Sequence, residues 1–214
     1  APNVPSIYKV PQMFDEQKFG DSVLKSFGMR AKKSNLKEWN DLATTIESAD
    51  KPVKIAVIGK YFASGGYVLS DAYISVLEAI KHAAWSIGRK PEIAWLNSED
   101  YEKDPKAVKE LDQYDGLLIP GGFGSRGIEG KIKAIQYARE NNIPYFGICY
   151  GMQCAVIEYA RNVLGHHDAH TYEIDQKTKN AVVHLMDGQE ENVVQGTLGG
   201  TLRLGTYPCK LKPK

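Results

Sequence analysis

The 214-residue sequence lacks several features, and each absence excludes a class of protein. It holds only three cysteines, an odd number, which favours a reducing compartment over a disulfide framework. Its 27 lysines and arginines are balanced by 26 acidic residues, so nothing indicates binding to a nucleic acid or a membrane surface. No apolar run approaches the roughly 20 residues that span a bilayer, and the first residues do not resemble a signal peptide. With 43% hydrophobic residues available for a core, we expect a cytoplasmic globular domain.

The first fifty residues differ from the rest of the chain. They contain two short amphipathic stretches, at residues 21–27 and 36–46, but no buried strand. Ser34 and Asn35 are placed to cap the second stretch. We interpret residues 1–50 as a linker or the end of a neighbouring domain, and residues 51–214 as the domain that carries the function.

From Val53 onward, short β-branched runs alternate with amphipathic helical patterns. The predicted strands are at residues 54–59, 92–96, 116–120 and 143–148, and the predicted helices at 71–85, 107–111, 128–139 and 151–163. This alternation predicts an α/β fold with a doubly wound, flavodoxin-like parallel sheet. After Ala169, β-like runs at 181–186 and 200–210 predict a β-rich C-terminal extension. Ligands of such sheets bind at the carboxyl ends of the strands.

Two glycine-rich segments lie at predicted strand ends. Gly147-x-Cys149-x-Gly151 stands between a strand and a helix, which is the context of a nucleophile elbow with cysteine as the nucleophile. The N-terminus of the helix would favour the thiolate, although a free cysteine can also be a small buried apolar residue. Gly121, Gly122 and Gly124 could direct backbone N–H groups at an oxyanion, or could form a plain turn. Their spacing does not fit a dinucleotide fingerprint.

These segments resemble a known family. Residues 120–130, 142–153, 155–161 and 198–205, together with the leading residues 6–11, are similar to the glutaminase domain of the CTP synthase family, a class I glutamine amidotransferase domain that follows a linker. The resemblance implies that Cys149 is the nucleophile and that the backbone N–H groups of Gly122 and Tyr150 form the oxyanion hole. It further implies that glutamine is contacted by Gly122, Tyr150, Gly151, Met152, Gln153 and Glu173.

The resemblance also implies a reaction and partners. The family hydrolyses L-glutamine through a cysteine thioester and passes the ammonia to a synthetase domain of the same enzyme, which uses ATP and Mg²⁺ to aminate UTP to CTP. This domain would then need no cofactor and no metal of its own. GTP is a possible allosteric activator, and the full-length enzyme is expected to be a homotetramer.

The sequence departs from the family in several places. Tyr150 follows the nucleophile where leucine is usual, and the segment at residues 62–70 is several residues longer. The family's catalytic histidine, followed two residues later by glutamate, has no counterpart among the five histidines, which are His82, His166, His167, His170 and His184. A metal site at the histidine cluster is disfavoured, since no cysteine or carboxylate pattern completes it. We therefore expect a C-terminally incomplete glutaminase domain that is inactive, or nearly so, by itself.

Two other functions remain open. The chain could be a non-catalytic glutamine-binding or regulatory module in which Cys149 is vestigial. It could also be a stand-alone cysteine hydrolase of the related intracellular-protease or deglycase type. Those enzymes commonly place histidine directly after the cysteine, where this chain has Tyr150.

Overall fold

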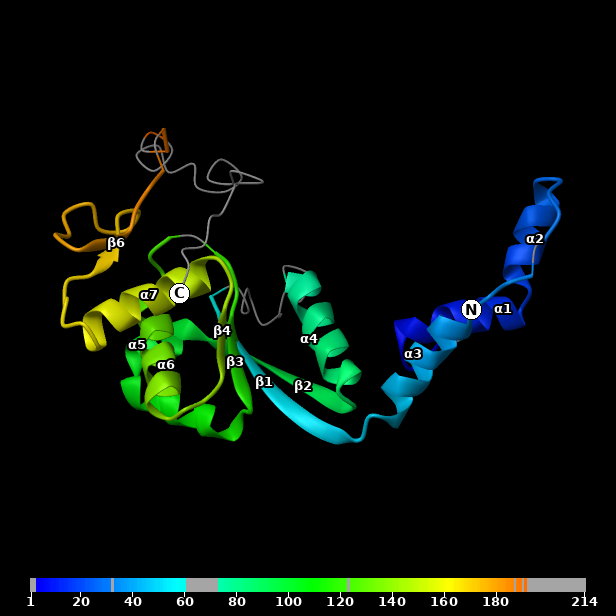
Figure 1. The fold of residues 1–214 in the computed structure, drawn as a ribbon, viewed down its shortest axis with the longest axis horizontal. Helices are drawn as coiled ribbons and strands as arrows, with labels where there is room; N and C mark the ends of the chain where they lie inside the picture. Colours follow the sequence, from blue (N-terminus) through cyan, green and yellow to red (C-terminus); the bar gives the residue numbers. More distant parts are fainter. Residues whose placement is uncertain are drawn as a thin grey trace, which may run out of the picture. The chain divides into compact units, whose positions relative to one another are not determined.

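The computed structural model describes residues 3–31, 33–60, 73–122, 124–186, 188, 189 and 191. The chain divides into two compact units (Figure 1). The first unit contains Ala1–Val53 and Leu77–Glu92, and the second contains Lys54–Val76 and Ile93–Lys214. The boundary that the sequence suggests at residue 50 stays a prediction.

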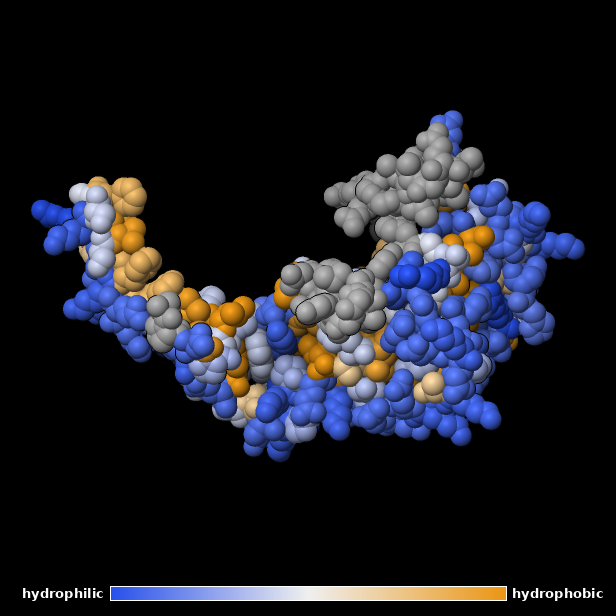
Figure 2. Space-filling model, turned by 180° about the vertical axis from the view of Figure 1, so that it is seen from behind, coloured by the Kyte–Doolittle hydropathy of each residue, from blue (hydrophilic) through white to orange (hydrophobic). Residues whose placement is uncertain are grey.

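The first unit is helical. It contains the 3₁₀ helix η1 (Ile7–Lys9), α1 (Val10–Glu16), α2 (Phe19–Ser26), α3 (Lys37–Ser48) and most of α4 (Ile74–Ser86). Both amphipathic stretches predicted in the first fifty residues are confirmed as α2 and α3. Figure 2 shows apolar side chains along one side of α1 and α2, and Phe14, Phe19 and Phe27 are among the exposed ones.

The capping prediction for α3 is only partly right. The residue that caps the helix is Leu36, which makes no side-chain cap bond. Asn35 lies one residue earlier, and its side chain accepts a 3.3 Å hydrogen bond from the N–H of Lys37. Ser34 instead donates its hydroxyl to Asp15, at 2.6 Å. The helix begins one residue later than the pattern suggests, so these two side chains act from outside it.

Within the first unit, Tyr8 packs against α4. Its hydroxyl donates to Glu78 at 2.6 Å and lies 2.5 Å from Nε2 of His82. The Tyr8 ring meets the Trp85 ring edge to face, with centroids 5.3 Å apart. Burial and the neighbouring carboxylate raise the pKa of Tyr8 to about 12, so the hydroxyl stays a donor. Tyr8 therefore holds the N-terminal residues to α4.

The central sheet is parallel, as predicted. It consists of β1 (Lys51–Gly59), β2 (Arg89–Asn97), β3 (Gly116–Ile119) and β4 (Tyr145–Gly147), in the order β2-β1-β3-β4. The strand β1 pairs with β3 and β3 pairs with β4, both in parallel. This is the flavodoxin-like strand order, in which the chain reverses its direction across the sheet between β1 and β3. All of β3 is buried, which explains its continuous apolar sequence.

Helices cover one face of the second unit's strands. Figure 1 shows α5 (Ser98–Lys103), α6 (Ile128–Glu140) and α7 (Tyr150–Asn162) grouped beside β3 and β4. Their buried residues form one core with the strands, which includes Ile119, Ile128, Ile132, Ile135 and Ile157. None of the helices in the described ranges is long and apolar enough to cross a membrane.

The prediction between β2 and β3 is incomplete. The helix predicted at 107–111 is confirmed as the 3₁₀ helix η3 (Pro105–Gln113), whereas α5 before it was not predicted. The side chain of Asn97 caps α5 by accepting from the N–H of Glu99. Asp104 then adopts an extended conformation and caps η3, because the α region is disfavoured before Pro105. The proline thus divides one predicted connection into two short helices.

The segment after α7 forms two short strands, β5 (His170–Thr171) and β6 (Ala181–Val183), which pair in parallel. The strand β6 occupies part of the β-like run predicted at 181–186. The second predicted run, at 200–210, lies outside the described residues. The β-rich extension as a whole therefore stays a prediction.

Candidate active site

Cys149 lies on a sharp turn between β4 and α7. Its backbone has φ +52° and ψ −108°, a combination that is strained for a residue with a side chain, and it caps the N-terminus of α7. Cys149 is exposed and free. The exposed sulfur therefore lies at the positive end of a helix of 13 residues, as the elbow interpretation predicts.

The glycines on either side of the elbow are required sterically. A β-carbon at Gly147 would lie 2.6 Å from backbone atoms of Gly151 and Met152, and one at Gly151 would lie 2.1 Å from the carbonyl oxygen of Ile119. Real Cβ contacts are not this short, so only glycine fits either position without backbone movement. The G-x-C-x-G pattern thus reflects the close packing of the first turn of α7 on the ends of β3 and β4.

The glycine-rich segment after β3 lies against the nucleophile. A β-carbon at Gly121 would stand 3.5 Å from Cβ and 3.9 Å from Sγ of Cys149. Tyr73 donates its hydroxyl to the carbonyl oxygen of Gly121 at 3.0 Å. Gly122, the predicted oxyanion-hole residue, directly follows Gly121 and is half-buried. The structure therefore brings together Cys149 and the segment that carries Gly122.

Gly124 connects this segment to two further predicted site residues. Its N–H donates to Oε1 of Glu173, and its carbonyl oxygen accepts from the hydroxyl of Tyr150, both at 3.0 Å. Its φ of +81° is in the left-handed region that favours glycine. Glu173 was predicted to contact glutamine, which stays a prediction; in this structure its carboxylate accepts a hydrogen bond from the glycine-rich segment. That contact could not be read from the sequence.

A buried lysine lies behind the elbow. Lys131 on α6 is 2% exposed, and its ammonium lies 5.1 Å from the centroid of the Tyr150 ring. Burial lowers the pKa of Lys131, and a nearby positive charge on Lys60 lowers it further. The thiol of Cys154 is also fully buried, and burial raises its pKa to about 11. Cys154 therefore remains a protonated core residue.

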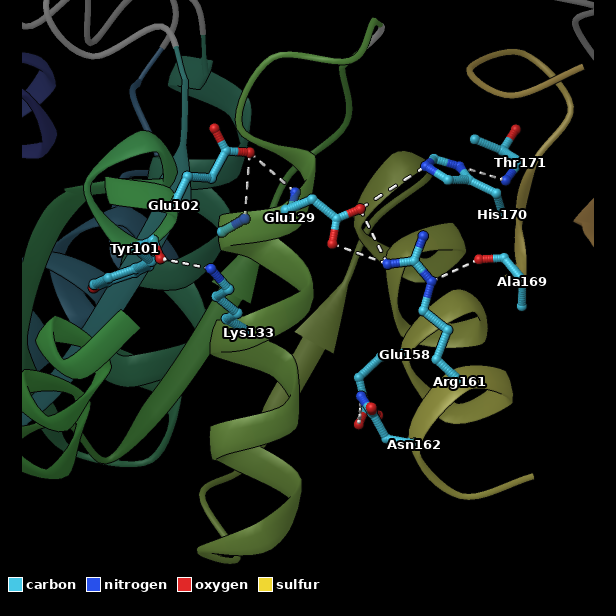
Figure 3. Close-up of polar contacts among 11 residues, drawn as sticks. Tyr101, Glu102, Glu129, Lys133, Glu158, Arg161, Asn162, Ala169, His170 and Thr171 are labelled. Carbon is cyan, nitrogen blue, oxygen red and sulfur yellow. Dashed lines mark hydrogen bonds and ion pairs between the residues drawn. The ribbon is translucent and has the colours of Figure 1, made fainter. Parts of the chain in front are cut away.

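Figure 3 shows a polar network that fixes the start of α6 and the segment after α7. Glu102 accepts hydrogen bonds from the N–H groups of Glu129 and Gly130, in the first turn of α6. Arg161 on α7 donates to both carboxylate oxygens of Glu129, at 3.0 and 2.9 Å, and to the carbonyl oxygen of Ala169 at 2.6 Å. This network attaches the chain that leads to Glu173 to α6 and α7.

Two of the histidines, His170 and His184, contact neighbouring side chains or backbone groups. His170 lies 3.9 Å from a carboxylate oxygen of Glu129, and its Nδ1 accepts from the N–H of Thr171 (Figure 3). The His184 ring stacks on Tyr172, with centroids 4.6 Å apart. Within the described ranges, no group of three or more His, Cys, Asp or Glu side chains is placed to hold a metal ion.

The remaining predicted residues are on or beside the elbow. Gly151 and Met152 are in the first turn of α7, where Met152 is half exposed, and Gln153 is half-buried. The contacts of these residues with glutamine stay predictions. The long segment at 62–70 and the family-like motif at 198–205 lie outside the described residues. Tyr73 and Lys131 were missed by sequence reasoning, because their places in the site depend on tertiary packing.

A family match covers most of the second unit. Residues 68–211 match the family described as glutamine amidotransferase class-I. The matched region includes both the glycine-rich segment and the elbow.

Curated relatives and a solved structure resemble the chain closely. It is 47% identical over 212 residues to CTP synthase of Lactiplantibacillus plantarum and 47% identical over 205 residues to CTP synthase of Sulfurisphaera tokodaii. These matches cover 99% and 96% of this chain but only 38% and 37% of the relatives. A structure of Trypanosoma brucei CTPS, its glutaminase domain with bound acivicin, is 44% identical, with a TM-score of 0.57 over 63% of this chain and 50% of that one. The chain thus spans less than two fifths of the length of the curated relatives that it matches.

Proposed function

The chain belongs to the glutamine amidotransferase class-I family, and from this premise we propose that Cys149 hydrolyses the side-chain amide of L-glutamine. The observation that carries the proposal is the position of Cys149, exposed at the N-terminus of α7 and so near the glycine-rich segment that a β-carbon at Gly121 would stand 3.9 Å from its sulfur. An exposed cysteine in that position is accessible to a substrate.

The proposed reaction has two stages. Sγ of Cys149 attacks the amide carbon, and the negative charge that develops on the oxygen is stabilised by the N–H groups of Gly122 and Tyr150. The C–N bond then breaks, and the nitrogen takes a proton and leaves as ammonia. Water attacks the remaining thioester, which releases glutamate and restores the thiol. The carboxylate of Glu173 complements the ammonium group of glutamine.

The proton transfers require a base. In residues 1–214, no histidine is followed two positions later by glutamate. We therefore propose that this chain by itself forms a covalent bond to a reactive glutamine analogue but turns glutamine over slowly or not at all. The curated relatives extend well beyond the matched region, so a longer protein could supply such a pair.

The wider role proposed for the chain follows its relatives. We propose that the ammonia serves a synthetase domain that aminates UTP to CTP with ATP and Mg²⁺, in a homotetramer that GTP activates. The similarity to two CTP synthases over nearly the whole chain supports this role. The match continues through the first fifty residues, which is consistent with their interpretation as the segment next to a synthetase domain.

Covalent labelling tests the glutaminase site. Acivicin is bound in the solved glutaminase domain that resembles this chain, so we choose it as the probe of the site. We expect acivicin to add to Cys149 and not to Cys154, as peptide mass spectrometry would detect. Cys154→Ala should still be labelled, whereas Cys149→Ala should not.

Two outcomes would contradict the proposal. If the folded chain forms no adduct, the non-catalytic glutamine-binding module becomes the better interpretation. If Cys149→Ala is labelled as fast as the unsubstituted chain, the nucleophile is another residue. Rapid release of glutamate from glutamine by the 214-residue chain would instead contradict the proposed need for a further base.

A further inference from the structure

Tyr150 makes a side-chain contact that its predicted role does not require. Its backbone N–H is a proposed oxyanion donor, which any residue type could provide. Its side chain is 1% exposed, and its hydroxyl donates to the carbonyl oxygen of Gly124 at 3.0 Å. A buried tyrosine hydroxyl needs such a partner, and here the partner belongs to the glycine-rich segment.

The peptide groups around Gly124 are held from two sides. Tyr150 binds the carbonyl oxygen and Glu173 accepts from the N–H, so two side chains from different segments fix one residue. Gly124 has a left-handed backbone conformation and lies two residues after Gly122. A shift of Gly124 would therefore change the direction of the Gly122 N–H.

We propose that the Tyr150 hydroxyl positions the oxyanion hole by fixing Gly124, and that Tyr150 is thus a positioning residue for the nucleophilic step. The inference rests on the proposed glutaminase function. One residue would then supply one oxyanion donor from its backbone and align the other, Gly122, through its side chain. Loss of a complete oxyanion donor costs about 10²–10³ in kcat, so we expect misalignment of one to cost about tenfold.

Tyr150→Phe is the informative variant. It removes only the hydroxyl and keeps the ring that faces the ammonium of Lys131. Tyr137→Phe is the matched control, because it removes a tyrosine hydroxyl that donates to Asp112 at 2.8 Å, on α6 and away from the elbow. Tyr137→Phe therefore controls for the loss of a tyrosine hydroxyl and its hydrogen bond, at a position that is more exposed than the fully buried Tyr150.

Inactivation by a glutamine chloromethyl ketone separates binding from reaction. Sγ of Cys149 attacks the probe, chloride leaves and a thioether forms, and the ketone oxygen occupies the oxyanion hole during the attack. For Tyr150→Phe we expect the maximal inactivation rate to fall about tenfold while the half-saturating probe concentration changes less than twofold. Tyr137→Phe should match the unsubstituted chain in both the maximal inactivation rate and the half-saturating probe concentration.

Amide hydrogen exchange gives a readout that does not depend on reactivity. We expect the N–H of Gly124 to exchange faster in Tyr150→Phe than in the unsubstituted chain or in Tyr137→Phe. Unchanged inactivation and unchanged exchange in Tyr150→Phe would overturn the inference. A change in the half-saturating probe concentration alone would also overturn the inference, since the Tyr150 hydroxyl would then affect binding of the probe and not its reaction. If even the unsubstituted chain does not react with the chloromethyl ketone, the proposed function fails. The exchange measurement still tests the inference in that case, because unchanged exchange of the Gly124 N–H in Tyr150→Phe would show that the hydroxyl does not fix Gly124.

Discussion

Gly151 lies directly against the carbonyl end of β3, where a β-carbon would stand 2.1 Å from the carbonyl oxygen of Ile119. The same oxygen accepts a hydrogen bond from the N–H of Ile148 at 2.9 Å. The end of β3 thus fixes the residues before and after the nucleophile. This close approach makes the elbow a part of the sheet's packing rather than a surface turn.

Gly151→Ala should therefore destabilise the second unit. We expect a loss of about 1–3 kcal/mol in the free energy of unfolding, since backbone atoms must move to admit the methyl group. Urea unfolding followed by circular dichroism would measure it. Gly116→Ala in β3 is the control, because its β-carbon would make ordinary contacts no shorter than 3.5 Å. Equal stability of the two variants would show that the elbow relaxes without cost.

The strained backbone of Cys149 leads to a second prediction. Its φ of +52° costs about 1–3 kcal/mol for a residue with a side chain, and glycine relieves this strain. Both Cys149→Ala and Cys149→Gly should abolish acivicin labelling. We expect Cys149→Gly to melt a few degrees above Cys149→Ala, although part of the gain is offset by the greater entropy that glycine loses on folding. A lower melting temperature for the glycine variant would mean that the backbone is not strained there.

The sequence predicted the parts of the site that depend on local pattern. The alternation of apolar runs and helical patterns is sufficient to predict the parallel sheet. The G-x-C-x-G pattern is sufficient to predict the elbow. Both predictions use only residues that are neighbours in the chain. The contact between Tyr150 and Gly124 joins residues 26 positions apart, so no local pattern could reveal it. Glu173 shows both cases, since the resemblance selected the residue but not its bond to Gly124.

The 3₁₀ helix η3 shows a different limit. Its apolar residues Val108 and Leu111 are buried three positions apart, a spacing that suits an α-helix and a 3₁₀ helix equally. The periodicity therefore predicted a helical segment but not its type. Lys131 was also unpredictable, because its sequence neighbourhood on α6 does not indicate that a charged side chain is buried there.

His170 allows a third prediction, concerning electrostatics. Burial lowers its pKa, and the positive charge of Arg161 lowers it further. The folded state favours the neutral form of a histidine whose pKa is lowered. The free energy of unfolding therefore decreases as the pH falls from the unfolded pKa of His170, about 6.5, toward its folded pKa. Arg161→Gln should raise the pKa of His170, as NMR titration of the ring would show.

The control for that titration is Arg139→Gln. Arg139 pairs with Glu158 at 2.8 Å and also joins α6 to α7, but near the opposite end of α6 from Glu129. We expect it to leave the His170 titration unchanged. If Arg139→Gln shifts the titration as much as Arg161→Gln does, loosening of the two helices, rather than the charge of Arg161, sets the pKa of His170.

The buried ammonium of Lys131 gives the fourth prediction. Because burial lowers its pKa, the folded chain releases this proton at a pH where the unfolded chain, with a lysine pKa of about 10.4, still holds it. The charged lysine therefore opposes folding at neutral pH, and stability is gained as pH rises through the folded pKa toward the unfolded value. Lys131→Met should melt above the unsubstituted chain at pH 7, and the difference should shrink toward pH 10. Lys109→Met, at an exposed position in η3, should show no such trend. A difference for Lys131→Met that stays constant from pH 7 to pH 10 would mean that its charge does not oppose folding.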